Sequence, residues 1–319
     1  MSLDDQTRRF IETSTARPGP PPGSMPLKDF RAAVEAFRPL GFEREEVREV
    51  QDVEIAAADG GVVRARVYIP DVAGPVPVVV WAHGGSWVRV TVDLLDGHFR
   101  VYANRSACAI VAVDYGLAPE SRFPRAIDEV HAAVAWARAD GGGFGWDTGR
   151  VGIGGESSGA NIAAAVAMGD RDLGEPGLAH QTLIVPVLDV RFATPSWGEL
   201  GSGYLLTAAQ LEWAVQQYAP GVDRADPRLS PALAPDLEGL PPTLIVTGEF
   251  DPLRDEGERY AQRLQAAGVA VDHVRVDGLI HHALMVPKLI GLGARMLQDT
   301  AAATGQALRA PSASGTATR

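Results

Sequence analysis

Cysteine is nearly absent from this chain of 319 residues, which contains only Cys108. A single cysteine excludes a framework of intramolecular disulfide bonds. Cys108 lies in the stretch SACAIVAVDY, whose apolar composition is typical of a buried strand. We therefore expect its thiol to pack in the protein core and not to act as a reactive group.

Long apolar runs are absent as well. No stretch approaches the ~18 consecutive apolar residues that indicate a membrane-spanning helix. The N-terminal stretch MSLDDQTRRF contains acidic side chains and lacks the apolar segment of a secretory signal. These two absences predict a cytoplasmic protein that does not have the membrane as a partner.

Positive charge is in the minority, with 29 Lys and Arg against 40 Asp and Glu and a net charge of −11 at pH 7. This acidic balance argues against nucleic acid and anionic membrane surfaces as general partners. The apolar share of 46% and the charged share of 22% are ordinary for a globular protein. The length suits one large α/β domain with an appendage, or two modest domains.

The order of apolar patterns predicts the fold class. A Pro- and Gly-rich segment at 14–26 is expected to be an extended arm, and a helix follows from Leu27 until Pro39 and Gly41 end it. An antiparallel hairpin is predicted next, at 51–57 and 62–70. Strands are then predicted at 75–83, 109–115, 150–155, 180–188, 242–249 and 269–276, and helices at 123–140, 158–168, 207–219, 254–268 and 283–303. Alternating strands and helices indicate a mostly parallel sheet with helices on both faces.

Two adjacent serines stand in GESSG, residues 155–159, between a predicted strand and a predicted helix. The pattern G-x-S-x-G with Ser157 in the middle is typical of a strained turn that exposes a nucleophilic serine. Ser158 then takes the first helical position, where its backbone N–H points towards developing negative charge. A structural or phosphate-binding turn is the alternative, but neither G-x-x-x-x-G-K-[ST] nor G-x-G-x-x-G is present at this turn.

A serine that attacks a carbonyl also needs N–H donors for the oxyanion that forms. The segment WAHGGSW, residues 81–87, follows an apolar strand, and its two glycines allow backbone amides to turn inward. Gly84 and Gly85 are the candidate donors. We expect His83 to brace this loop and not to take part in proton transfer.

An acid and a histidine complete the pattern, in the chain order serine, acid, histidine that accompanies G-x-S-x-G. Asp251 follows the predicted strand at 242–249, at the sheet edge where open α/β proteins gather functional groups. A helix cap is the alternative role for an aspartate in such a loop. His281 and His282 lie in the loop after the last predicted strand.

Taken together, these segments resemble the hormone-sensitive-lipase-like family of carboxylesterases, family IV. The similarity extends over HGGSW, DYGLAPESRFP, GGESSGANIAA, DPLRDEGERYAQRL and GLIHHAL, in the order found in that family, from about residue 76 to 290. The resemblance implies an α/β-hydrolase fold, in which helices cover both faces of a mostly parallel central sheet and a helical cap covers the site. It implies an N-terminal arm with cap helices at 1–45, a core at 46–190 and 226–302, and a cap segment at 191–225. The tail at 303–319 is expected to be disordered.

Residue by residue, the resemblance implies that Ser157 is the nucleophile, Asp251 the orienting acid and His281 the base. The backbone amides of three residues are implied as the oxyanion hole, namely Gly84, Gly85 and Ser158. Neither a metal nor an organic cofactor is implied.

Three positions depart from the family pattern. Ser86 replaces the third glycine of HGGG, Gly116 replaces the arginine of DYRLAPE, and His282 replaces the glycine after the histidine base. His282 stays an alternative to His281 as the base, although alignment on Gly278 favours His281. The residues expected to contact substrate are Ser86, Trp87, Tyr204, Leu205 and His282.

The function implied is hydrolysis of short- to medium-chain acyl esters through an acyl-enzyme intermediate. An acyltransferase, a deacetylase or a lactonase with the same catalytic residues is the first alternative, and a catalytically silent ligand-binding relative is the second. The expected partner is a small-molecule ester, with a homodimer as an open alternative to a monomer.

Overall fold

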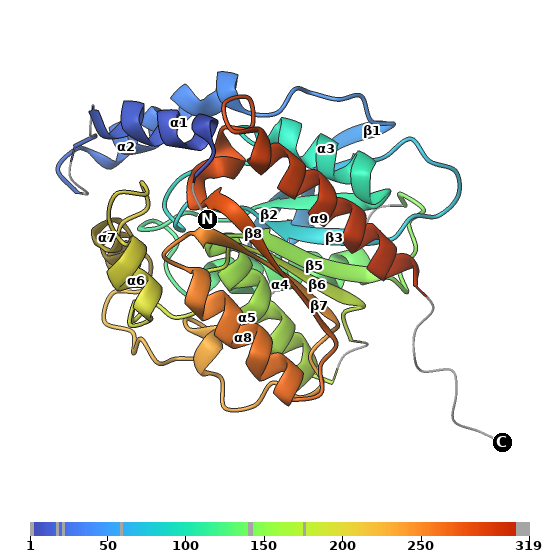
Figure 1. Ribbon diagram of the computed structural model, residues 1–319. Helices are drawn as coiled ribbons and strands as arrows, with labels where there is room; N and C mark the ends of the chain where they lie inside the picture. The colour runs from blue at the N-terminus through green and yellow to red at the C-terminus, as the bar shows by residue number, and fades with distance from the viewer. Residues whose placement is uncertain are drawn as a thin grey trace.

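An eight-stranded sheet lies at the centre of the molecule in the computed structural model, which describes residues 3–16, 19–20, 23–57, 60–139, 143–174 and 177–310 (Figure 1). The strands are β1 (Glu49–Ala56), β2 (Val62–Ile69), β3 (Val78–Ala82), β4 (Ala109–Asp114), β5 (Val151–Glu156), β6 (His180–Ile184), β7 (Thr243–Phe250) and β8 (Val271–Ile280). Their order across the sheet is β1-β2-β4-β3-β5-β6-β7-β8. β2 pairs antiparallel with both β1 and β4, and all other pairs are parallel. The predicted hairpin and the mostly parallel sheet are therefore confirmed.

Nine helices surround the sheet in the described ranges. They are α1 (Asp5–Ala16), α2 (Leu27–Ala33), α3 (Asp96–Ser106), α4 (Arg125–Arg138), α5 (Ser158–Asp172), α6 (Pro195–Leu200), α7 (Ala208–Tyr218), α8 (Arg254–Ala266) and α9 (Gly291–Arg309). Side chains of α3 and α9 pack in one apolar cluster, and side chains of α4, α5 and α8 pack in another. The sheet is thus covered on both faces, as predicted. None of these helices is long and apolar enough to cross a lipid bilayer.

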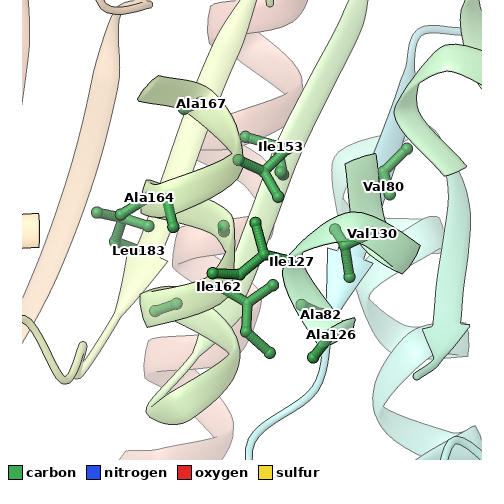
Figure 2. Close-up of a cluster of buried hydrophobic side chains, with 14 of the residues drawn as sticks. Val80, Ala82, Ala126, Ile127, Val130, Ile153, Ile162, Ala164, Ala167 and Leu183 are labelled. Atoms are coloured by element: carbon green, nitrogen blue, oxygen red, sulfur yellow. The ribbon is translucent and has the colours of Figure 1, made fainter. Parts of the chain in front are cut away.

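β3 shows why its sequence is an unbroken apolar run. Val78, Val80 and Ala82 belong to the cluster on the α4 and α5 face, whereas Val79 and Trp81 belong to the cluster on the other face. Successive side chains of a strand point to opposite faces, so a strand covered on both sides is apolar throughout. Figure 2 shows Val80 and Ala82 among the side chains of α4, α5, β5 and β6.

Cys108, just before β4, is fully buried as expected, and burial raises the pKa of its thiol to about 11.

The C-terminal helix differs from its prediction at both ends. Residues His281–Met285 form a short 3₁₀ helix, and α9 begins only at Gly291. At the other end α9 continues to Arg309, so residues 303–309 are not the disordered tail that was expected. Thr304 is buried there, and its hydroxyl hydrogen-bonds the hydroxyl of Tyr102 at 2.8 Å. Ala310 follows as the C-cap of α9, and residues 311–319 of that tail lie outside the described residues.

The N-terminal residues contain a helix, α1, that the apolar spacing does not reveal. Asp4 begins it, because its carboxylate accepts hydrogen bonds from the backbone N–H and the hydroxyl of Thr7. At the start of α9, the N–H of Gly291 donates to the side chain of Gln6 at 3.0 Å. Contacts with distant segments therefore hold a helix whose own sequence is largely polar.

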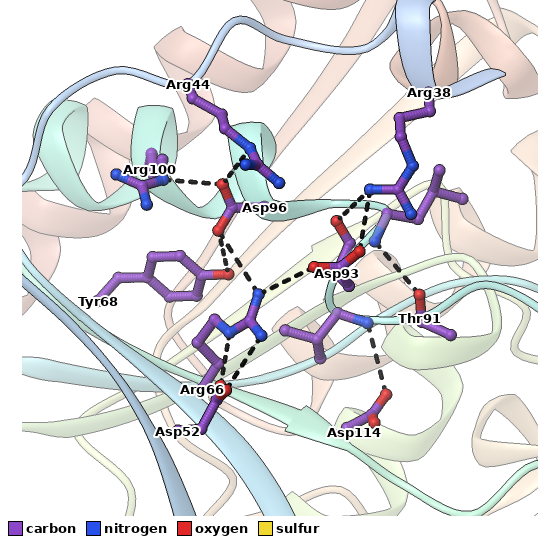
Figure 3. Close-up of polar contacts among 12 residues, drawn as sticks. Arg38, Arg44, Asp52, Arg66, Tyr68, Thr91, Asp93, Asp96, Arg100 and Asp114 are labelled. Atoms are coloured by element: carbon purple, nitrogen blue, oxygen red, sulfur yellow. Dashed lines mark hydrogen bonds and ion pairs between the residues drawn. The ribbon is translucent and has the colours of Figure 1, made fainter. Parts of the chain in front are cut away.

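A group of charges connects the N-terminal region to the sheet (Figure 3). The carboxylate of Asp96, with a side chain 5% exposed, accepts hydrogen bonds from Arg100 at 2.8 Å and from the Tyr68 hydroxyl at 3.2 Å, and pairs with Arg44 at 3.0 Å and Arg66 at 3.7 Å. These partners come from the segment before β1, from β2 and from α3. Paired buried charge of this kind is costly to disrupt, so Asp96 fixes how these segments meet.

The helices α1 and α2 lie on the same side of the molecule as α6 and α7 (Figure 1). Contact between the two groups is direct, since the rings of Phe30 in α2 and Trp213 in α7 are 5.0 Å apart between centroids. Thr207 caps α7 through a reciprocal pair of hydrogen bonds with Gln210. Both α6 and α7 fall in the segment 191–225 that was expected to form a cap.

Glu256 of α8 anchors the chain that leads into α6. Its carboxylate accepts hydrogen bonds from the backbone N–H groups of Leu188 at 2.6 Å and Asp189 at 3.3 Å and from the indole of Trp197 at 3.3 Å. Burial raises the pKa of Glu256 to about 8, while these three donors oppose the rise. The folded protein therefore holds the Glu256 proton at pH values where an unfolded chain has lost it.

This raised pKa predicts a pH dependence of stability. The unfolded chain releases the proton near the ordinary glutamate pKa of about 4.3. The stability that Glu256 contributes is therefore complete below that pH and is lost as the pH rises to about 8. We expect the free energy of unfolding of the wild type, minus that of Glu256→Gln, to fall between about pH 5 and pH 8, by at most about 1.4 kcal/mol per pH unit. Urea denaturation of both proteins at three pH values measures this, and a difference independent of pH would contradict it.

Candidate active site

Ser157 occupies the turn between β5 and α5, as its G-x-S-x-G pattern predicts. Its backbone has φ 57° and ψ −120°, a strained conformation for a non-glycine residue, and α5 begins at the next residue, Ser158. Gly159 allows the turn because a side chain there would overlap the backbone of Ala82 at the end of β3. The hydroxyl of Ser157 therefore projects from the carboxyl end of the central strands.

A continuous series of hydrogen bonds joins three of the predicted residues. Ser157 Oγ and His281 Nε2 are 2.9 Å apart, and His281 Nδ1 and Asp251 Oδ2 are 2.8 Å apart. The carboxylate accepts the Nδ1 proton, which leaves Nε2 as the acceptor for the serine hydroxyl. The structure thus brings together residues that are separated by 94 and 30 positions in the chain.

Asp251 is fully buried, and both of its carboxylate oxygens have partners. Oδ2 meets His281, while Oδ1 accepts the backbone N–H of Leu253 at 2.9 Å just before α8 begins. Asp251 is not the cap of α8, because Leu253 is the N-cap residue and no side chain caps that helix. One oxygen of Asp251 holds the turn before α8, and the other meets the imidazole of His281.

The loop after β3 corrects one prediction. The backbone N–H of Gly84 donates to Glu156 Oε1 at 2.6 Å, so it is not available to an oxyanion. Within the described part of the chain, the N–H groups of Gly85, Ser86 and Ser158 donate to no protein acceptor. The prediction of Gly84 as a donor was wrong because its partner, Glu156, lies 72 positions away in the sequence.

His83 braces this loop, as expected. The Nδ1–H of His83 donates to the carbonyl of Gly84 at 2.7 Å, and its ring stacks on Tyr115 with centroids 4.3 Å apart. The hydroxyl of Tyr115 in turn donates to the His83 carbonyl at 2.6 Å. Burial lowers the pKa of His83, which keeps the ring neutral.

Ser157 and His281 line a cavity of about 410 Å³. A larger cavity of about 730 Å³ lies beside Ile55, Arg122 and Trp136 and contains none of the predicted site residues. The smaller cavity is mainly apolar, and α1, the residues after α2 and the cap segment supply part of its wall through Phe10, Val34, Phe37, Leu205, Leu206 and Gln210. Substrate-sized cavities with a few polar groups at one end are typical of small-molecule sites.

Only some of the residues expected to contact substrate line this cavity. Ser86, Leu205 and His282 do. Trp87 does not, because it is fully buried and stacks on Tyr218 with centroids 4.9 Å apart. Tyr204 is also absent from the cavity wall and stacks on Phe250 at 5.4 Å.

The structure explains the glycine at position 116. A side chain there would overlap the hydroxyl of Ser121. The N–H of Gly116 donates to Glu129 at 2.7 Å, and the guanidinium of Arg125 donates to the other carboxylate oxygen at 2.8 Å. A cation is therefore present beside this loop, but it comes from α4.

The cavity wall contains two charged residues that sequence reasoning missed, Arg89 and Glu156. Glu156 also accepts the indole N–H of Trp81 at 2.6 Å, and burial raises the pKa of Glu156 to about 7. The position of Glu156 next to Ser157 in the sequence indicated that it lies near the site, but it did not indicate its hydrogen-bond partners.

In the described ranges no cluster of three or more His, Cys, Asp or Glu side chains has the arrangement of a metal site.

Comparisons with known proteins agree with this architecture. A family model described as the α/β hydrolase fold matches residues 79–285. The carboxylic ester hydrolase LipN of Mycobacterium tuberculosis is 40% identical over 76% of this chain and 66% of its own length, so the chain spans just under two thirds of that relative. The carboxylesterase NlhH of the same organism is 39% identical, with 70% and 72% covered. The arylesterase of Saccharolobus solfataricus is 31% identical over 90% of this chain and 94% of that protein.

Solved structures of esterases also superpose closely on this chain. An ester hydrolase from the metagenome of Lake Arreo superposes with a TM-score of 0.90 at 35% identity, covering 96% of this chain and 99% of the other. A thermostable esterase from Pseudomonas putida superposes with a TM-score of 0.91 at 32% identity, covering 97% and 98%. With the sheet order and the turn at Ser157, these similarities show that the chain is a carboxylic ester hydrolase of the α/β hydrolase fold and belongs to the hormone-sensitive-lipase-like family, family IV.

Proposed function

We propose that this protein is a serine carboxylesterase in which Ser157, His281 and Asp251 form the catalytic triad. The observation that carries the proposal is the hydrogen-bonded series from Ser157 Oγ through His281 to the buried Asp251, at the wall of a substrate-sized cavity. Such an arrangement places a base within reach of the serine proton and an acid that fixes the tautomer of that base.

In the proposed mechanism His281 Nε2 takes the Ser157 proton while Oγ attacks the ester carbonyl. Asp251 stabilises the imidazolium that forms. His281 then gives the proton to the departing alcohol, and an acyl group remains on Ser157. Water, activated by the same base, attacks this acyl-enzyme and releases the acid and the free serine.

The oxyanion of each tetrahedral intermediate is proposed to accept hydrogen bonds from the N–H groups of Gly85, Ser86 and Ser158. This set replaces Gly84 by Ser86, because Glu156 already accepts the Gly84 N–H. Ser86 has φ 55°, a conformation that glycine adopts more readily. Ser86, which replaces the third glycine of HGGG, thus keeps a backbone conformation typical of glycine. In this conformation its N–H is proposed to donate to the oxyanion, as the glycine N–H would.

The proposed substrates are esters of short- to medium-chain acids. A largely apolar cavity of about 410 Å³ supports this range. We expect kcat/KM for p-nitrophenyl esters to be highest between acetate and hexanoate and to fall at dodecanoate by at least about tenfold, since the acyl chain shares that volume with the nitrophenyl group. A series from acetate to dodecanoate tests this, and undiminished hydrolysis of dodecanoate would contradict it.

The same assay separates hydrolysis from acyl transfer. With an added alcohol or amine, a hydrolase gives mainly the free acid, whereas an acyltransferase gives mainly the new ester or amide. We expect the free acid to dominate.

The cytoplasmic location and the homodimer stay predictions from the sequence.

A further inference from the structure

Arg89 lies on the loop after β3, four residues beyond Gly85 of the proposed oxyanion hole. It lines the 410 Å³ cavity that contains Ser157, and also a small adjoining cavity bounded by Phe30 and Trp213. The backbone N–H of Arg89 donates to the carbonyl of Gly85 at 3.1 Å. This single turn fixes the backbone of Arg89 relative to the proposed oxyanion hole.

Within the described residues, the guanidinium of Arg89 forms neither an ion pair nor a hydrogen bond. It lies over the face of the Phe30 ring, and its central carbon is 4.8 Å from the ring centroid. Arg31, one residue after Phe30, offers a contrast. Its guanidinium binds Glu120 at 2.7 Å and the carbonyls of Val88 and Ala118 at 2.8 Å. Because surrounding protein desolvates a cation at a cost, an arginine without an anion is unusual in such a position.

The rest of the cavity wall leaves this positive charge uncompensated. Among the described lining residues the one carboxylate is Glu156, and both of its oxygens are already engaged by Gly84 and Trp81. His282 lines the same cavity, and its Nδ1 is buried without a partner among the described residues. Burial and the nearby charges of His281 and Arg89 lower the pKa of His282 to about 3, so its ring is neutral and can still donate one hydrogen bond.

We propose that Arg89 binds a carboxylate of the substrate, so that the preferred esters carry a negative charge in addition to the scissile ester group. The inference rests on the proposed hydrolase function and names its substrate class. A planar guanidinium with a fork of donors suits a carboxylate, and one apolar face of the group stays on the Phe30 ring. The charge belongs either to the acid part, as in a monoester of a dicarboxylic acid, or to the alcohol part, as in an acylated hydroxy acid.

Two matched pairs of esters test the proposal and distinguish these two sources. For the acid part, the p-nitrophenyl monoester of glutaric acid is compared with p-nitrophenyl valerate, which has the same chain length. For the alcohol part, 4-acetoxybenzoate is compared with 4-methylphenyl acetate. The measured quantity is the ratio of kcat/KM for the charged ester to that for the neutral ester, in wild type, Arg89→Met, Arg89→Lys and the control Arg64→Met, which removes an exposed arginine of β2.

We expect the ratio to fall about 10- to 100-fold in Arg89→Met for one of the two pairs, mainly through KM, because a charged hydrogen bond is lost. Arg89→Lys should restore part of it, and Arg64→Met should leave it unchanged. A ratio that is the same in wild type and Arg89→Met for both pairs would overturn the proposal and would show that Arg89 only holds the Phe30 ring.

A binding measurement separates failure of this proposal from failure of the hydrolase proposal. In the Ser157→Ala background, monoethyl glutarate and 4-acetoxybenzoate are titrated and the Tm is recorded with and without Arg89→Met. Stabilisation by one charged ester that requires Arg89 supports the proposal even if no ester is hydrolysed. Absence of stabilisation in a protein that does hydrolyse neutral esters would overturn the carboxylate site alone.

Discussion

Ser157→Ala is expected to lower kcat for p-nitrophenyl butyrate by about 10⁴- to 10⁶-fold while leaving the fold intact. The substitution removes the atom that forms the acyl-enzyme, and serine hydrolases lose activity on this scale when their nucleophile is removed. Ser157 is 8% exposed at the cavity wall, and its hydroxyl contacts His281. The Tm should therefore change little, because the loss involves one oxygen that faces the cavity and not core packing.

The neighbouring serine provides a matched control. Ser158 is fully buried, and its hydroxyl accepts the backbone N–H of Trp87 at 3.3 Å. Ser158→Ala keeps the backbone amide that is proposed to bind the oxyanion, so we expect kcat to fall by less than about tenfold. If Ser157→Ala kept a few per cent of wild-type activity in a clean preparation, or if Ser158→Ala were the more damaging change, Ser157 would not be the nucleophile.

His281→Ala is the second change with a large expected effect, a fall in kcat of about 10⁴-fold or more. The reason is geometric, since His281 is the residue that touches both Ser157 and Asp251, at 2.9 and 2.8 Å. Without it the serine keeps its proton, and the leaving alcohol has no donor. The variant is assayed with p-nitrophenyl butyrate across neutral and alkaline pH.

His282→Ala is the control that this chain supplies. The ring of His282 is 5.6 Å from that of His281 between centroids, and its low pKa of about 3 makes it a poor base. We expect its removal to lower kcat by less than about tenfold. Equal losses in the two variants, or a larger loss in His282→Ala, would reverse the assignment of the base.

The features predicted from the sequence are those that local patterns determine. The unbroken apolar run of β3 predicts a strand covered on both faces, and the structure has it. The glycines around Ser157 predict a strained turn between a strand and a helix, and that turn is present as well. In each case the residues that decide the structure lie within a few positions of one another.

The misplaced oxyanion donor shows the limit of such patterns. Two glycines after His83 indicate that amides turn inward, but not which of them already has an acceptor. That depends on Glu156, which reaches the loop from the adjacent strand β5. The residues of the cavity wall are equally hard to predict from local sequence. Trp87 and Leu205 are both apolar loop residues, but Leu205 lines the cavity and Trp87 packs in the core against Tyr218.

The helical ends were mispredicted for a related reason. Residues 303–309 are mostly small or polar in sequence, yet Thr304 and Leu308 are buried against the sheet. The helix α1 likewise depends on contacts far away in the chain, such as that of Gln6 with Gly291. Tertiary contacts override weak local propensity at such sites.

The central claim is that His281 and Asp251 activate Ser157 as a nucleophile. It is tested most directly by treating the folded wild type with a fluorophosphonate and locating the adduct by mass spectrometry of the peptides, beside Ser157→Ala and His281→Ala. The account predicts one adduct on Ser157 in the wild type, none in Ser157→Ala, and strongly slowed labelling in His281→Ala. An unlabelled wild type, or an adduct on any other residue, would contradict it.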